Sequence, residues 1–195
     1  MSAFRVSSVR PAARMGLKGP DAATLLQQAG VPLPGAPNRI VSGGVQGTPA
    51  GGAEAVAVRV LRLGSTEFIL EQDEGDAVIT TVRDLARSAG LRAWPVLRAD
   101  CSLVISGEDA FDRLARVCAF DFAQLAGQPD MAVMTLLADI SVTLALETAA
   151  PAHAVPAPAP AQPRLRLWAD AGFATYLTQT LQSLSPDAPS HGVHA

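Results

Sequence analysis

The side chains that most often carry nucleophilic and acid–base catalysis are few in this sequence, and their positions do not favour a catalytic site. His153 lies in a stretch rich in proline and alanine, and His191 and His194 lie within the last five residues. A catalytic histidine must be held by packing and by a second hydrogen bond. His191 and His194 have a spacing that could chelate a metal weakly, but a flexible tail is the better interpretation. We therefore expect no Ser-His-Asp or Cys-His mechanism, no catalytic residue and no metal site in this chain.

The cysteines and paired glycines also lack the spacings of cofactor sites. Cys101 and Cys118 match neither a metal-binding spacing nor a C-x-x-C redox pair, so we expect two reduced, buried thiols. The glycine pairs at 43–44 and 51–52 are not followed by Lys-Ser/Thr, and they do not form the G-x-G-x-x-G of a dinucleotide site. We therefore expect no cofactor-binding residue here, and any NAD or flavin would bind to another chain.

Carboxylates are numerous, and most have a simple structural interpretation. Asp73, Glu74 and Asp76 crowd one turn, which favours a solvated loop followed by a helix start. Asp100 precedes an expected strand and Asp121 follows an expected helix. Either could line a cleft, but each is more often a cap or turn residue.

The two tryptophans, Trp94 and Trp168, have two interpretations. Tryptophan dominates the hot spots of protein interfaces, so either residue could anchor a partner. Packing in the core is an equally good explanation for each.

Composition predicts a globular chain with a substantial core. Of the 195 residues, 49% are hydrophobic and 17% are charged, which argues against wholesale disorder and allows one domain or two small packed halves. The net charge of −3 gives no reason to expect a nucleic-acid or anionic-membrane partner. The longest apolar run, 131–146, is interrupted by Asp139, so no membrane span is expected. The first residues lack a signal-peptide core, and we expect a cytoplasmic protein.

Hydrophobic periodicity predicts alternating helices and strands. Apolar residues recur at helical spacing in four segments: 20–29, 76–89, 108–118 and 171–184. Extended segments are expected near 14–17, 54–63, 67–71, 93–98, 101–106, 131–137, 140–147 and 165–168. Glycines predict a mobile loop over 42–52, and prolines predict an extended spacer over 148–163.

The sequence also contains an internal echo. Gly-Pro-Asp-Ala at 19–22 opens the first expected helix, and Gly-Glu-Asp-Ala at 107–110 opens the third. Glycine permits a tight strand-to-helix turn, and an acid in the first turn complements the helix dipole. Two similar α+β halves would explain the echo, although Gly-x-Asp-Ala is a common helix start.

An ordered series of short motifs runs through most of the chain. It comprises RMGLKGPDA at 14–22, PNR at 37–39, RLGSTEFIL at 62–70, DCSLVISG at 100–107, DA at 109–110, LW at 167–168 and FATYL at 173–177. No single motif is specific, but the order and spacing from about residue 14 to residue 184 resemble the sarcosine oxidase gamma subunit family. The positions that carry the resemblance are expected to be structural or interface residues: Gly19, Asp21, Asn38, Arg39, Gly64, Glu67, Gly107 and Trp168.

The resemblance implies a fold and a domain organisation. That family is similar to the folate-binding aminomethyltransferase of the glycine cleavage system. An α+β fold is therefore expected, with two packed α/β halves of the aminomethyltransferase folate-binding-domain type, mostly antiparallel sheets and four helices. Residues 1–195 would form one gamma-like domain with halves at about 12–92 and 93–184. The Pro/Ala-rich spacer at 148–163 and a flexible tail at 185–195 would complete it.

The resemblance also implies a role in an assembly. It suggests a heterotetramer of alpha, beta, gamma and delta chains that oxidatively demethylates sarcosine to glycine and passes the one-carbon unit to tetrahydrofolate. FAD, FMN and NAD would belong to the alpha and beta chains and zinc to delta, while gamma would pack against alpha without a catalytic residue. The scarcity of plausible sites in the sequence agrees with that role.

Three other hypotheses stay open. The first is a gamma-like subunit of another N-methyl amino acid dehydrogenase, and the second is a stand-alone folate-binding one-carbon protein. The stand-alone form lacks the K-G-C-Y/F-x-G-Q-E signature of folate-dependent iron–sulfur assembly proteins, because Lys18-Gly19 is followed by Pro20. The third is an α+β scaffold in an unrelated complex.

Overall fold

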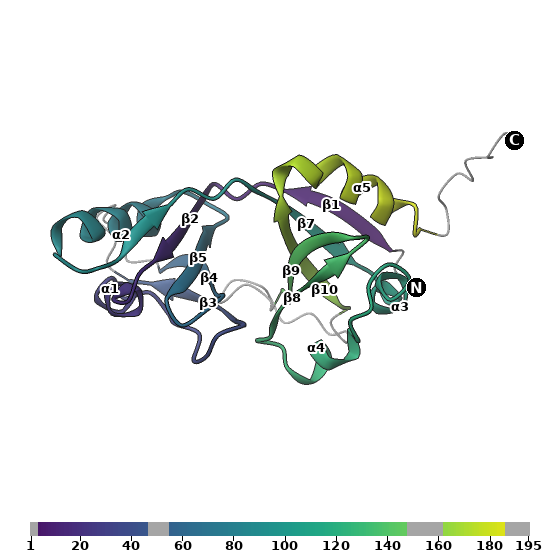
Figure 1. The fold of residues 1–195 in the computed structure, drawn as a ribbon, viewed down its shortest axis with the longest axis horizontal. Coiled ribbons are helices and arrows are strands. Elements are labelled where there is room, and N and C mark those ends of the chain that lie inside the picture. The colour runs from purple at the N-terminus through teal and green to yellow at the C-terminus, as the bar shows by residue number, and fades with distance from the viewer. Residues whose placement is uncertain (1–3, 47–54, 148–161, 186–195) are drawn as a thin grey trace, which may run out of the picture.

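Two five-stranded antiparallel sheets face each other in the computed structural model, which describes residues 4–46, 55–147 and 162–185 (Figure 1). The first sheet has the order β3 (Arg39–Val45), β4 (Val56–Arg62), β5 (Glu67–Gln72), β2 (Ala13–Lys18) and β6 (Trp94–Val96). The second has the order β1 (Arg5–Val9), β7 (Asp100–Ser106), β10 (Arg164–Asp170), β9 (Ile140–Leu146) and β8 (Ala132–Leu137). The hairpins expected over 54–71 and 131–147 are confirmed as β4–β5 and β8–β9.

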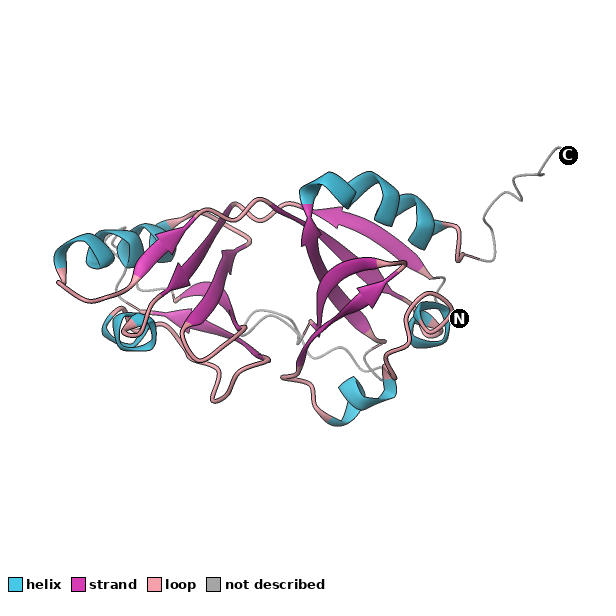
Figure 2. Ribbon diagram, viewed as in Figure 1, coloured by secondary structure: helices cyan, strands magenta, loops and turns pink. Residues whose placement is uncertain are grey.

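Helices cover the outer faces of both sheets (Figure 2). In the described part of the chain they are α1 (Ala22–Gln28), α2 (Ala77–Ser88), α3 (Ala110–Leu114), α4 (Ala123–Gly127) and α5 (Ala174–Gln182), with a 3-10 turn η1 (Ala171–Phe173). The α+β class with two mostly antiparallel sheets is therefore confirmed, with five α-helices where four were expected. The additional α4 is a single turn, too short to show a helical period.

Each sheet builds its own outer core. On the first sheet, Leu25 and Leu26 of α1 and Val82 of α2 pack over Val60 and Leu70. On the second, Leu177 and Leu181 of α5 and Leu114 of α3 pack over Leu103 and Leu167. All ten side chains are fully buried or nearly so, and this accounts for the helical apolar periodicity of these segments.

The internal echo corresponds to a repeated backbone turn. Gly19 has φ +138° and Gly107 has φ +135°, and the following Asp21 and Asp109 have φ −101° and −96°. Each glycine carbonyl accepts a hydrogen bond from the N–H three residues on. The equivalent apolar residues after the turns are all buried: Ala22, Ala110, Leu26 and Leu114.

The chain passes between the sheets more than once. β1 precedes β2 in the sequence, yet it pairs with β7 of the second sheet. β6 follows α2 and pairs back with β2 of the first sheet, directly before the chain enters β7. Two crossing connections, 10–12 and 97–99, therefore join the sheets (Figure 1).

A third core lies between the sheets. It contains Ile40, Leu61 and Ile69 from the first sheet and Ala132, Ala145 and Trp168 from the second. One backbone bridge, between Arg39 and Met131, continues the contact at the end of β3. At this part of the junction, the inner faces of the two sheets therefore meet through apolar side chains.

The glycine-rich segment differs from expectation. Residues 42–45, expected to lie in a mobile loop, form the second half of β3 and pair with β4 as far as Val45 opposite Val56. β3 is an edge strand, where glycine is tolerated, and Pro32 packs so closely on Gly43 that an added Cβ would lie 3.0 Å from its ring. β1 was not expected, because Arg5–Val9 has little apolar alternation.

Several other expectations lie outside the described residues. These are the rest of the glycine-rich segment, most of the spacer at 148–163, the tail beyond residue 185, and His153, His191 and His194. Among the helices that are described, none is long and apolar enough to cross a bilayer.

Candidate functional site

A buried ionic cluster, hereafter the junction cluster, joins the two sheets around Glu71 of β5. Glu71 is 1% exposed, and its carboxylate accepts hydrogen bonds from Arg14 Nε at 2.6 Å and Arg166 Nη1 at 3.0 Å. It also accepts from the Trp168 indole N–H at 2.7 Å and from Arg59 Nη1 at 3.3 Å. Arg14 and Arg59 come from the first sheet and the other two donors from β10 of the second. One carboxylate therefore links four strands from the two sheets: β2, β4, β5 and β10.

Two outer carboxylates complete the junction cluster. Asp73 pairs with Arg59 at 3.0 Å and Arg166 at 3.2 Å, and Glu147 pairs with Arg166 at 2.6 Å and with Arg164. Burial alone would raise the pKa of each acid, but the guanidinium groups outweigh it and hold both below their ordinary values. Burial would lower the pKa of Arg166, and the surrounding carboxylates raise it instead. These shifts favour the charged forms of Asp73, Glu147 and Arg166 at neutral pH.

The lowered pKa values make stability depend on pH. The folded protein binds fewer protons at Asp73 and Glu147 than the unfolded chain, whose ordinary values are 3.8 and 4.5. Their contribution is therefore complete above about pH 5 and is lost as the pH falls through the folded pKa values. We expect the free energy of unfolding, measured by urea denaturation, to fall below about pH 4.5. In Glu147→Gln this fall should be shallower, because one of the two groups no longer titrates.

Glu74→Gln provides the control for that measurement. Glu74 is exposed beside Asp73, and no ion pair joins it to another described residue. Its substitution should leave the acid slope as in the wild type. An unchanged slope in Glu147→Gln would contradict the assignment.

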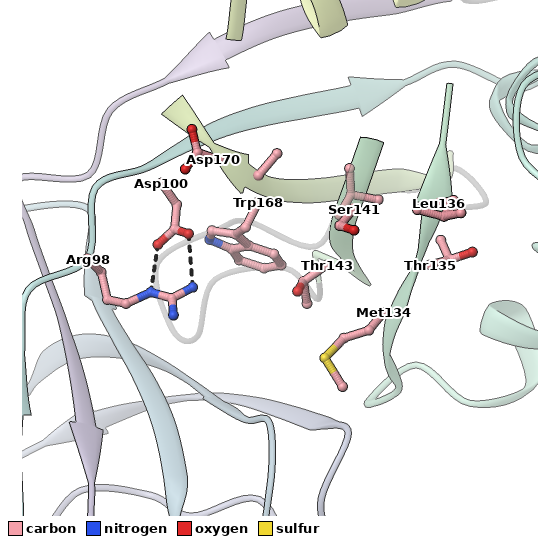
Figure 3. Close-up of a pocket in the computed structure, with 11 residues that line it drawn as sticks. Arg98, Asp100, Met134, Thr135, Leu136, Ser141, Thr143, Trp168 and Asp170 are labelled. Carbon is pink, nitrogen blue, oxygen red and sulfur yellow. Dashed lines mark hydrogen bonds and ion pairs between the residues drawn. The ribbon is translucent and has the colours of Figure 1, made fainter. Parts of the chain in front are cut away.

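A hollow of about 460 Å³ opens beside the junction cluster, on the inner face of the second sheet (Figure 3). Trp168 lies at its base, and Met134 and Leu136 of β8 line one side. At the other side, Arg98 and Asp100 form a two-pronged ion pair at 2.8 and 2.9 Å. The remaining polar lining includes the hydroxyls of Ser141 and Thr143.

Arg98, at one side of the hollow, packs on Gly16 of β2, where the missing side chain leaves room for it. An added Cβ there would lie 3.1 Å from Arg98 Cγ, so the Arg98 stem rests directly on β2. Since Arg98 is neutralised by Asp100, the pair offers neither a free base nor a free cation to a ligand. Nearby, burial raises the pKa of the Cys101 thiol, which donates to the Asp170 carbonyl and is therefore a poor nucleophile.

The eight positions that carry the family resemblance lie in turns or in contacts between neighbouring segments. Gly19 and Gly107 form the two repeated turns described above. Asp21 does not cap α1 with its side chain. Its carboxylate accepts from the backbone N–H and the guanidinium of Arg92, and these bonds lower its pKa.

The other positions lie at the junction or near it. Asn38, at φ +58°, accepts from the Ala132 N–H, and Arg39 pairs with Asp130 at 2.9 Å, so both connect β3 to the start of β8. Gly64 lies in the β4–β5 turn. Glu67 closes that turn through its carbonyl and pairs with Lys18 at 3.0 Å. Of the eight positions, Trp168 alone lines the hollow.

The other acids, the tryptophans and the cysteines singled out from the sequence lie either at structural positions or in the lining of the hollow. Asp100 lines the hollow, whereas Asp121 accepts from the Ala123 N–H and starts α4. Trp168 is 2% exposed and belongs to the intersheet core, while Trp94 is 57% exposed on the edge strand β6. Cys118 is buried and Cys101 partly buried, and both are free thiols.

Sequence reasoning missed the junction cluster. It interpreted Asp73 as a loop residue and did not single out Glu71, Arg14, Arg59 or Glu147. The available signal was a charged residue inside an otherwise apolar strand, as in EFILEQ of β5 and RLRLWAD of β10. Within the described residues, no group of three or more His, Cys, Asp or Glu side chains is arranged to hold a metal ion.

Comparison with solved structures identifies the fold. A chain of the heterotetrameric sarcosine oxidase from Corynebacterium sp. U-96, in complex with pyrrole 2-carboxylate, is similar with a TM-score of 0.67 and 22% identity. The alignment covers 93% of this chain and 83% of that one. Glycine cleavage system aminomethyltransferase T from Bartonella henselae gives a TM-score of 0.62 and 14% identity, over 92% of this chain and 45% of that one. No family model and no curated protein sequence matches the chain. The chain therefore has the α+β fold found in these two proteins.

Proposed function

We propose that this chain is a non-catalytic structural subunit of a sarcosine oxidase assembly. The assembly would demethylate sarcosine oxidatively to glycine and pass the one-carbon unit to tetrahydrofolate. Alpha, beta and delta chains would be its cytoplasmic partners, carrying FAD, FMN, NAD, tetrahydrofolate and zinc. The observation that carries the proposal is fold similarity over nearly the full length of both this chain and a chain of a heterotetrameric sarcosine oxidase.

The chemistry of the described residues supports a structural role. The charged groups of the junction cluster are directed at one another, and Arg98 is directed at Asp100. Such saturated ion pairs hold strands together, and the Arg98–Asp100 pair offers neither a free acid nor a free base to the hollow. A subunit of this kind contributes shape and contact surface to an assembly.

Co-expression with candidate alpha and beta chains tests the proposal. The chain should co-elute in size-exclusion chromatography with a complex that shows flavin absorbance, and the purified chain alone should not turn over sarcosine. Failure to co-elute with any flavin-containing complex would count against the proposal. Turnover of an N-methyl amine by the isolated chain would also count against it.

Two alternatives make different predictions. A gamma-like subunit of another N-methyl amino acid dehydrogenase would co-elute in the same way, but the complex would prefer a different N-methyl amine. A stand-alone folate-binding protein is favoured by the likeness to aminomethyltransferase T and by the open hollow at Trp168. Saturable binding of tetrahydrofolate to the isolated chain, followed by titration calorimetry, would support that second alternative.

A further inference from the structure

The outer edge of β8 is paired only at its start. β8 bonds to β9 along one side. On its other side, the Ala132 N–H donates to the Asn38 carbonyl at 2.9 Å, and the Ile40 N–H donates to the Asp130 carbonyl at 2.8 Å. This short ladder belongs to the junction between the two sheets, and no strand of the described residues continues it.

Strand geometry determines which backbone groups come next along this edge. Because N–H and C=O groups alternate in direction along a strand, those of Met134 and Leu136 point the same way as those of Ala132, away from β9. The two-residue turn after Leu137, with positive φ at both of its residues, agrees with this register. Backbone hydrogen bonds to other described residues are lacking for the outward groups of Met134 and Leu136.

The side chains at this edge are apolar and exposed. Met134 is 56% exposed and Leu136 is 58% exposed, and both lie over the hollow that contains Trp168 (Figure 3). Natural edge strands are usually protected by charges, proline or bulges, and the sequence AVMTLL of β8 contains neither charge nor proline. The unprotected part of the edge is continuous with the intersheet ladder.

We propose that the edge of β8 at Met134–Leu136 docks an extended segment of a different chain of the assembly. The segment would add a strand beside β8, continuing the ladder that Asn38 and Ile40 begin. Its alternate apolar side chains would cover Met134 and Leu136 and enter the hollow. This inference rests on the proposed function, because it assumes that the chain binds a partner chain in an assembly.

Charge complementarity defines the chemistry of that segment. Asp139, at the far end of β8, and Asp170, at the rim of the hollow, form no ion pair with another described residue. Asp139 lies in the β8–β9 turn at the end of this edge, whereas Asp170 lies across the hollow at the end of β10 and caps η1 through the Gly172 N–H. The docked segment should therefore carry a basic side chain opposite Asp139, beside its apolar ones.

A second copy of this chain fits the edge less well. Antiparallel pairing of two β8 strands about Thr135 would set Asp139 of one copy opposite Met131 of the other, beside Asp130. The basic side chain at that place, Arg39, is already paired with Asp130. A homodimer would therefore leave Asp139 without a partner.

The test uses co-expressed alpha and beta chains as the probe. Met134→Pro removes an outward N–H together with the Met side chain and keeps the groups that bond to β9, and Leu136→Lys places a charge on the apolar surface. Each should raise the Kd for the flavin-containing complex by about tenfold or more. Leu97→Lys, which makes the same change at a site 91% exposed and outside β8, should leave the Kd within about twofold. Thermal unfolding of each variant verifies that the fold is retained.

The outcomes separate this inference from the proposed function. If the wild type binds and both β8 variants bind equally well, the docking edge is wrong and the proposed function stands. If the wild type binds no flavin-containing complex, both fail. If the isolated chain dimerises in sedimentation equilibrium and Leu136→Lys abolishes the dimer, the occupant is a second copy and the proposal is overturned. Hydrogen-exchange protection of Met134 and Leu136 amides in the complex would support it.

Discussion

Replacing Glu71 with glutamine is expected to lower the free energy of unfolding by about 3–5 kcal/mol. The carboxylate is fully buried, and it balances three guanidinium groups, of which Arg14 and Arg166 are themselves almost inaccessible to water. Removing one member of such a group leaves buried charges without compensation. An amide at this position would also turn an N–H₂ group toward guanidinium or indole N–H groups, which are donors and cannot accept a hydrogen bond.

Glu67→Gln is the matched control for this measurement. Glu67 lies in the same strand, and its ion pair with Lys18 is partly exposed, with side chains 50% (Lys18) and 32% (Glu67) accessible. Surface pairs of this kind contribute about 0–1 kcal/mol, so the control should change the unfolding free energy by no more than that. Both variants are compared by urea denaturation at pH 7. Equal effects of the two substitutions would show that the Glu71 pairs are not buried as the structure has them.

Glu71→Gln should weaken the packing between the two sheets more than it weakens the apolar core on the outer face of either sheet. Glu71 and Trp168 are the residues through which the ionic and apolar parts of the junction meet, joined by the indole hydrogen bond. A double-mutant cycle of Glu71→Gln with Trp168→Phe measures the coupling free energy of that bond. The apolar cores beneath α1, α2 and α5 contain neither residue.

Local features of the fold could be predicted from the sequence. Apolar spacing identified the helices that became α1, α2, α3 and α5, because each buries one face against a sheet. Alternation over 54–71 and 131–147 identified two hairpins, since each connects neighbouring strands by a short turn. The Gly-x-Asp-Ala echo predicted the repeated strand-to-helix turn, which has a local cause in the positive φ of glycine.

The candidate site could not be predicted in the same way, because its contacts are not local. Arg14, Arg166 and Trp168 lie 57, 95 and 97 positions from Glu71, and the strand crossings decide which residues meet. The sequence also has no periodic signal to show that β1 pairs in the second sheet and that β6 pairs in the first. A charge at an inward strand position indicates that a partner exists, but it does not identify the partner.

Gly19→Ala is the second substitution from which we expect a large effect, a loss of about 3 kcal/mol or more in the free energy of unfolding. Gly19 has φ +138°, a region that side chains avoid. An added Cβ would also lie 2.1 Å from the Arg92 carbonyl oxygen and 2.9 Å from Ala93 Cα. Both of these are backbone atoms, so no rotamer change can relieve the overlap, and the turn or the segment after α2 must move.

Gly90→Ala separates the overlap from the backbone strain. Gly90 also has a positive φ, +67°, but nothing lies within 4 Å of an added Cβ. Its substitution should therefore cost only about 1–2 kcal/mol, the usual difference for a left-handed residue. The difference between the two variants in denaturation at pH 7 measures the cost of the contact with Arg92.

The pKa of Asp21 gives a second measurement of whether Arg92 moves in Gly19→Ala. Asp21 owes its lowered pKa to hydrogen bonds from the Arg92 side chain and backbone, two residues beyond the turn that Gly19 forms. If the added methyl pushes Arg92 away, the pKa of Asp21 should rise toward its ordinary value of 3.8 in an NMR titration of Gly19→Ala. In Gly90→Ala it should stay low, because the Asp21–Arg92 contact is untouched. An Asp21 pKa that is unchanged in Gly19→Ala, together with a small loss of stability, would mean that the turn accepts a side chain and that its glycine is not required by the fold.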